Sequence, residues 1–183
     1  FGAIAAIVGA ALIVVFGGAL GVSAGLLVVA SGIGYAVGLA VVIGAGRTPG
    51  GIGHEVLRAL AAGGYRGQLY AVNPRAGRVA DVTAYPSILA VPGPVDLAVV
   101  AVPAARVSEV LTECGHKGVA GAVILTSGFS ELGANGLQSE ILAIARRHSI
   151  RLIGPNCLGL VNTAPDVALN ATFADVTPVP GSL

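Results

Sequence analysis

The stretch from Val41 to Leu60, VVIGAGRTPGGIGHEVLRAL, constrains the fold more than any other part of the chain. It opens with a short β-branched run, passes through a cluster of glycines and continues with Ile52, Val56 and Leu60 at helical spacing. A buried strand that ends in a glycine turn and leads directly into an amphipathic helix is typical of the first unit of a doubly wound sheet.

The chain after this first unit repeats the alternation of strands and helices. The first strand is expected within 38–46, and further strands are expected at 68–74, 95–103, 120–128 and 150–156. Helices are expected at 50–67, 104–118 and 134–149. This order predicts an α/β fold, a doubly wound parallel sheet of Rossmann type. The intervening segment 76–95 is rich in turn residues and should cover the sheet edge, with a helical turn near Ser87 to Leu89.

An apolar segment, residues 1–37, precedes this α/β region. It has no charged residue and is longer than the roughly 20 residues that a helix needs to cross a bilayer. The first positive charge is Arg47, which favours a cytoplasmic location for everything that follows. We therefore expect a membrane helix in 1–37 that tethers a cytoplasmic domain, 38–183, to the inner membrane. The segment could instead be buried against that domain, or be foreign to it.

Composition and cysteine spacing exclude several classes of function. The net charge is +1, and the basic residues are scattered without interleaved aromatic residues, which argues against nucleic-acid binding. Cys114 and Cys157 lie far apart without cysteine or histidine neighbours at metal-ligand spacing. They are expected to be free, buried thiols, and no metal site is predicted.

In a doubly wound sheet the ligand lies over the carboxyl ends of the strands, so the residues that follow each strand are the candidates. After the first strand, Gly44, Gly46 and Gly50 allow a tight turn and a close backbone approach to a pyrophosphate. Arg47 and Thr48 add a cation and a hydroxyl group, both suited to phosphate oxygens. This loop predicts a phosphate-bearing ligand, although a purely structural turn remains an alternative.

The end of the second strand separates the possible cofactors. A site for NAD has an acidic side chain here, which accepts a hydrogen bond from the ribose 2′-hydroxyl. This chain has Asn73-Pro74-Arg75 instead, a neutral amide and a cation that tolerate or attract an additional phosphate. The pattern therefore favours NADP or coenzyme A over NAD.

Six segments in order carry a family resemblance: VVIGAGRTPGGIGHEVLRAL, YAVNPRA, AYPSI, VPGPVDLAVVAVPA, GVAGAVILTSGFSELG and RLIGPNCLGLVNT. Together they closely resemble the CoA-binding domain of the NDP-forming acyl-CoA synthetases, relatives of the succinyl-CoA synthetase α subunit. The same domain occurs in CoA-binding protein acetyltransferases. The resemblance runs from about Gly38 to the end of the chain and does not include the apolar segment.

The resemblance implies a coenzyme A site made by the loops after the strands. The loop after the first strand would hold the CoA phosphates, and the turn after the second would add a basic contact beside Asn73. The end of the third strand would line the site, and the end of the fourth would contact the pantetheine or adenine portion. The turn GPNCLG would lead towards the active site. The residues implied are Gly46, Arg47, Thr48, Pro49, Arg75, Val102, Pro103, Leu125, Thr126, Ser127 and Asn156.

The resemblance also implies that this chain does not catalyse by itself. In the family a histidine on the next domain, supported by a glutamate, is phosphorylated, and acyl phosphate passes to the CoA thiol. The expected partners are therefore a phosphohistidine domain and an ATP-grasp domain, or the corresponding subunits, in a longer protein. His54, His116 and His148 are expected to be surface or helix-end residues.

Three alternatives to a ligase domain stay open at this point. The domain could be a CoA-sensing regulatory module of a fused protein acetyltransferase. It could belong to an NADP-dependent oxidoreductase, although Lys117, the only lysine, has no evident catalytic partner. It could also be a membrane-anchored interaction protein with an empty Rossmann fold.

Overall fold

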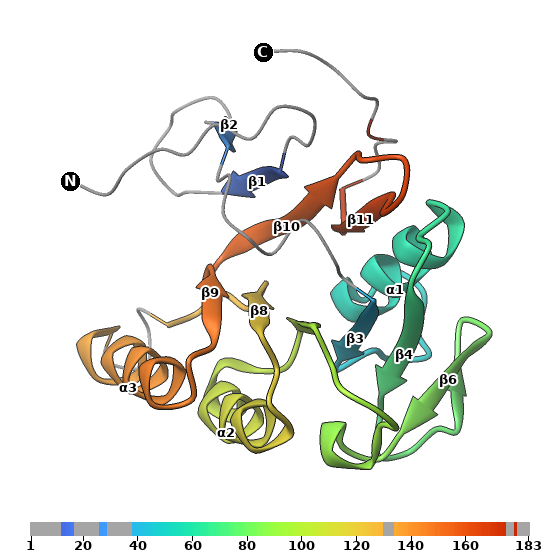
Figure 1. The fold of residues 1–183 in the computed structure, drawn as a ribbon. Coiled ribbons are helices and arrows are strands. Elements are labelled where there is room, and N and C mark those ends of the chain that lie inside the picture. Colours follow the sequence, from blue (N-terminus) through green and yellow to red (C-terminus); the bar gives the residue numbers. More distant parts are fainter. Residues whose placement is uncertain (1–11, 17–25, 29–37, 130–133, 175–177, 179–183) are drawn as a thin grey trace.

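The computed structural model describes residues 12–16, 26–28, 38–129, 134–174 and 178. Its centre is a seven-stranded sheet with the order β5-β6-β4-β3-β7-β8-β9 (Figure 1). In chain order its strands are β3 (Leu39–Ile43), β4 (Gln68–Val72), β5 (Arg78–Val79), β6 (Val82–Tyr85), β7 (Leu97–Val100), β8 (Gly121–Ile124) and β9 (Arg151–Ile153).

Three α-helices connect these strands. They are α1 (Ile52–Ala62), α2 (Val107–Lys117) and α3 (Ala134–Arg147), with short 3-10 turns at η1 (Ile88–Ala90) and η2 (Ala104–Arg106). All the strands and helices expected from the repeating pattern are present, and η1 confirms the expected helical turn. The edge segment also contributes β6, which pairs in parallel with β4, and β5, which pairs antiparallel with β6.

The strand order places a switch point between β3 and β7. All pairs from β6 to β9 are parallel, and the chain leaves β3 towards β4 on one side and returns to β7 on the other. The loops that follow β3 and β7 therefore diverge at the carboxyl edge, and ligands of doubly wound sheets bind where such loops diverge.

Burial on both faces explains why the central strands are continuous apolar runs. Every residue of β3, β7 and β8 is buried, as expected for parallel strands covered on both sides. One face packs against α1, through Val56, Leu57 and Leu60. The other face packs against η1, α2 and α3, and α2 and α3 lie side by side in Figure 1.

A second, antiparallel sheet adjoins α1. Its order is β11-β10-β1-β2, with β10 at Cys157–Asn162 and β11 at Leu169–Thr172. Leu160 and Leu169 of this hairpin belong to the same buried cluster as the α1 side chains. The sequence pattern predicted only a turn at the start of β10, because its six residues show no clear alternation that would indicate a strand.

The expected membrane helix is wrong where the structure describes the apolar segment. Leu12–Phe16 is strand β1 and Leu26–Val28 is strand β2, and β1 pairs antiparallel with β10 and β2. Apolarity indicates burial but does not distinguish lipid from protein, and the β-branched residues of β1 favour a strand. The rest of 1–37 lies outside the described residues. Within the ranges that the structure describes, none of the helices is long and apolar enough to span a bilayer.

Candidate functional site

The carboxyl ends of four neighbouring strands form the candidate site. Backbone hydrogen bonds join them into a row: Gly44 N–H donates to the Val72 carbonyl at 3.2 Å, Ala101 N–H to Ile43 at 2.9 Å and Leu125 N–H to Val100 at 3.0 Å. The segments after β4, β3, β7 and β8 therefore follow one another along one edge. The residues that the sequence singled out after these strands lie along this edge, except that the side chain of Leu125 packs into the core.

The glycine loop crosses very close to the end of β7. Gly44 has a φ of +88°, and a Cβ atom there would lie 2.5 Å from the carbonyl oxygen of Ala101. Only glycine fits this combination of left-handed backbone and close approach. The chain then turns outward, and Arg47, Thr48 and Pro49 are exposed to solvent.

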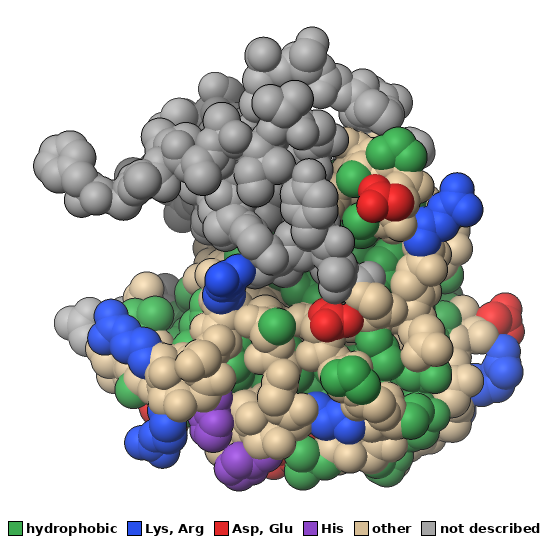
Figure 2. Space-filling model, in the orientation of Figure 1, with side chains coloured by type: hydrophobic (Ala, Val, Ile, Leu, Met, Phe, Trp, Pro, Cys, Tyr) green, Lys and Arg blue, Asp and Glu red, His purple; other side chains and the backbone are tan. Residues whose placement is uncertain are grey.

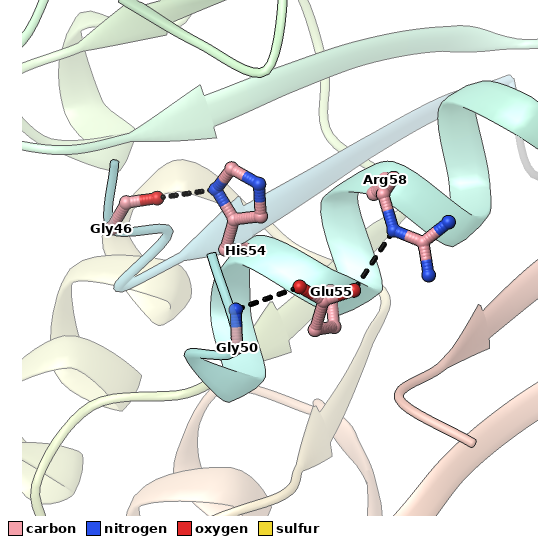
Figure 3. Close-up of polar contacts among 5 residues, drawn as sticks. All are labelled: Gly46, Gly50, His54, Glu55 and Arg58. Carbon is pink, nitrogen blue, oxygen red and sulfur yellow. Dashed lines mark hydrogen bonds and ion pairs between the residues drawn. The ribbon is translucent and has the colours of Figure 1, made fainter. Parts of the chain in front are cut away.

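Two side chains from neighbouring elements form hydrogen bonds with the start of this loop. His54, in the first turn of α1, lies 3.0 Å through Nδ1 from the carbonyl oxygen of Gly46 (Figure 3). Because a carbonyl oxygen only accepts, Nδ1 carries the proton and donates. Asn73 donates from Nδ2 to the carbonyl oxygen of Ala45 at 2.8 Å. Two successive peptide groups of the loop are thus fixed by neighbouring elements.

A third side chain fixes the end of the loop. The Glu55 carboxylate accepts from Gly50 N–H at 2.8 Å and from Arg58 Nε at 2.8 Å (Figure 3). These contacts lower the pKa of Glu55 below its ordinary value. The hydrogen bond from Gly50 has the larger effect, and the one from Arg58 adds to it. The carboxylate thus ties Gly50, the residue before the N-cap Gly51, to the first turn of α1.

The amide of Asn73 is already bonded within the protein at both ends. Its Nδ2 binds Ala45, and its Oδ1 accepts from Arg75 N–H at 2.8 Å in a tight turn. The structure therefore gives Asn73 a role in shaping the loop, and its contact with a ligand remains a prediction. Arg75 is exposed, and within the described part of the chain neither Arg75 nor Arg47 has a carboxylate partner.

The ends of β7 and β8 are tied to each other by a side chain. Thr126 donates from Oγ1 to the carbonyl oxygen of Val102 at 2.6 Å. Pro103 and Ser127 are exposed beside them. Leu125, by contrast, is only 3% exposed and its side chain packs into the core, so a ligand at this edge could reach only its backbone.

The turn after β9 is anchored to the same edge. Asn156 has a φ of +58°, its N–H donates to the Thr126 carbonyl at 3.0 Å, and its side chain is exposed. The next residue, Cys157, is buried and donates from Sγ to the carbonyl oxygen of Ile124 at 3.4 Å. Burial raises the pKa of the Cys157 thiol to about 11. It is therefore a protonated packing residue at neutral pH and a poor nucleophile.

On the face drawn in Figure 2 the charged side chains are dispersed, and so are the potential metal ligands in the part of the chain that the structure describes. Figure 2 shows charged side chains scattered over one face rather than gathered into a basic patch. Among the described residues there is no group of three or more histidine, cysteine, aspartate or glutamate side chains placed to hold a metal ion.

Three residues at the site were not predicted from the sequence: Gly53, His54 and Glu55. His54 is indeed at a helix end, but its bond to a backbone carbonyl eight residues earlier depends on the fold of the loop. Gly53 is buried because α1 packs on Gly44. Only Glu55 had a local signal, since acidic residues are favoured in the first turn of a helix by the helix dipole.

Comparison with known families settles what kind of domain this is. A family described as "CoA binding domain" matches residues 39–163, the whole span from β3 to just past β10. The chain belongs to this family. The matched span contains every strand end that forms the candidate site.

Curated relatives of this CoA-binding domain are much longer than the chain. It is 46% identical over 142 residues to an acetate–CoA ligase (ADP-forming) of Methanocaldococcus jannaschii, covering 78% of this chain and 20% of that protein. It is 46% identical over 138 residues to the alpha subunit of acetate–CoA ligase (ADP-forming) II of Pyrococcus furiosus, covering 74% of this chain and 29% of that subunit.

A solved structure has the same fold. It is described as a dinucleotide-forming acetyl-coenzyme A synthetase 1 of Candidatus Korarchaeum cryptofilum in complex with phosphate and ADP. The match has a TM-score of 0.72 and 39% sequence identity, and covers 78% of this chain and 30% of that chain. The resemblance expected from the sequence is thereby confirmed for the CoA-binding domain.

Proposed function

We propose that this chain binds coenzyme A, as the CoA-binding domain of an NDP-forming acyl-CoA synthetase. The observation that carries the proposal is the row of four strand ends with an open glycine loop, in a chain that belongs to the CoA-binding domain family. Arg47 on the glycine loop and Arg75 on the neighbouring turn are the cations proposed for the phosphates.

The positions of the other candidate residues support a division of the ligand along this edge. The loop 46–50 is proposed to hold the pyrophosphate, and Arg75 the phosphate on the ribose. The ends of β7 and β8, with Val102, Pro103, Thr126 and Ser127, are proposed to contact the adenine or pantetheine. Thr126 gives its one hydroxyl proton to Val102, so towards a ligand it can only accept, as from an N–H group.

We further propose that phosphoryl transfer depends on another domain or subunit. Among the three histidines, His54 is bonded to Gly46, and His116 and His148 pack edge to face with ring centroids 5.5 Å apart. None of them has a carboxylate bonded to its ring among the described residues. This arrangement supports a domain that presents CoA to chemistry supplied by a partner with a phosphohistidine and an ATP-binding site.

Calorimetric titration of the 183-residue chain tests the proposal. The ligands are CoA, dephospho-CoA, NADP and NAD at matched ionic strength, because phosphate contacts are screened by salt. We expect CoA to bind most tightly, with weaker binding of dephospho-CoA. A preference for NADP would instead support an oxidoreductase, and binding of none of the four would overturn the proposal.

A further inference from the structure

The orientation of two peptide groups at the start of the glycine loop has a cause outside the loop. Ala45 and Gly46 offer successive carbonyl oxygens, and each is held by a side chain from a different element. Asn73 at the end of β4 holds the first, and His54 in the first turn of α1 holds the second. Neither bond is available to an isolated loop.

These bonds determine where the loop amides point. In a trans peptide the carbonyl and the N–H lie on opposite sides of the bond, and both peptides are trans. The bond to Asn73 therefore turns the Gly46 N–H away from β4, and the bond to His54 turns the Arg47 N–H away from the His54 ring. Within the described residues neither N–H has an acceptor.

Two successive free N–H groups are a recognised way to bind an anion, and they stand beside the exposed Arg47. We infer that His54 is a positioning residue, which with Asn73 holds the Ala45–Gly46 and Gly46–Arg47 peptides so that their N–H groups are open to a phosphate of the ligand. The inference rests on the proposed function in one respect, which is the identity of the ligand as CoA. It requires that Nδ1 donates, and His54 does not touch the ligand itself.

The inference predicts which replacements of His54 preserve binding. The amide nitrogen of asparagine can occupy the place of Nδ1, whereas that of glutamine corresponds to Nε2 and is placed too far along the side chain. His54→Asn should therefore keep the bond to Gly46, and His54→Gln should lose it. Because the loop is proposed to hold the pyrophosphate, which CoA and dephospho-CoA share, the loss should be the same for both ligands.

Calorimetry of the full chain and the two variants provides the first test. We expect His54→Gln to weaken the binding of CoA and of dephospho-CoA by a similar factor, about 5-fold or more. The affinity of His54→Asn for both ligands should stay within about 2-fold of the parent. Equal weakening by both variants would show that the ring acts by packing, and no weakening would show that it does not position the loop; either result overturns the inference. Urea unfolding of both variants checks that they are folded.

A second measurement separates this inference from the proposed function. Inorganic pyrophosphate is titrated into the ¹⁵N-labelled chain while the amide signals of Gly46 and Arg47 are followed. We expect both signals to shift in the parent and in His54→Asn, and we expect His54→Gln to need about 5-fold more pyrophosphate or above for the same shift. This result would uphold the role of His54 even if the parent failed to bind CoA, whereas unshifted signals in the parent would overturn it.

Discussion

Gly53 in the first turn of α1 packs directly on the backbone of Gly44 at the end of β3. A Cβ atom on Gly53 would lie 2.6 Å from the carbonyl oxygen of Gly44 and 3.0 Å from Cα of Ala45. The helix can therefore approach the strand end only because Gly53 has no side chain. This contact fixes the start of α1, and with it His54 and Glu55, beneath the glycine loop.

Gly53→Ala should therefore destabilise the protein, by about 1 to 3 kcal/mol, since an added methyl group must push backbone apart. The measurement is the free energy of unfolding in urea. Gly136→Ala in α3 is the matched control, because a Cβ atom there meets nothing within 4 Å. In that exposed helical position alanine should stabilise by roughly 0.5 to 1 kcal/mol. Stabilisation by both substitutions would contradict the packing described for Gly53.

Arg47→Ala and Arg75→Ala should each weaken CoA binding by about 1 to 3 kcal/mol if the guanidinium groups pair with phosphate. The two should differ towards dephospho-CoA: Arg47→Ala should still weaken binding, while Arg75→Ala should have little effect. Calorimetric titration of both ligands measures this. Arg151→Ala removes the same charge at the amino end of β9, on the opposite edge, and should leave both affinities unchanged. Undiminished affinity in both site variants would show that Arg47 and Arg75 do not pair with the phosphates of CoA.

Glu55 should make stability depend on pH in the acidic range. Its pKa is lowered in the folded protein by Gly50 N–H and Arg58, so its contribution is complete above the unfolded pKa and is lost as pH falls through the folded pKa. The urea midpoint of the parent should exceed that of Glu55→Gln at neutral pH, and the difference should shrink between about pH 5 and pH 3. A difference that stays constant over this range would show that the carboxylate charge is not involved.

Both thiols should resist labelling in the folded protein. Burial raises the pKa of Cys157 to about 11 and that of Cys114 to about 12, so at pH 8 almost none of either thiol is ionised. Ellman's reagent should react slowly with the native chain and rapidly with two thiols in urea. Rapid reaction of Cys157 in the native chain would mean that the turn after β9 opens readily.

The repeating pattern of the sequence was sufficient for strands β3, β4, β7, β8 and β9 and for the α-helices, but not for the edge strands β5 and β6. Parallel strands buried on both faces are continuous apolar runs, and the amphipathic helices between them have a distinct period, so both are local signals. The same local reasoning failed for the apolar segment, where β1 pairs with β10 rather than forming a helix. Its partner lies more than a hundred residues away, and no local pattern specifies such a pairing.

The sequence by itself determined the fold class and the set of loops from which a ligand site could be made, because residues at the carboxyl ends of parallel strands must gather at one edge. Only the tertiary structure decided what each residue does there. It placed the Leu125 side chain in the core, bonded both ends of the Asn73 amide within the protein, and brought His54 to Gly46. These relationships join residues from different elements, and their geometry exists only once α1 has packed on the sheet.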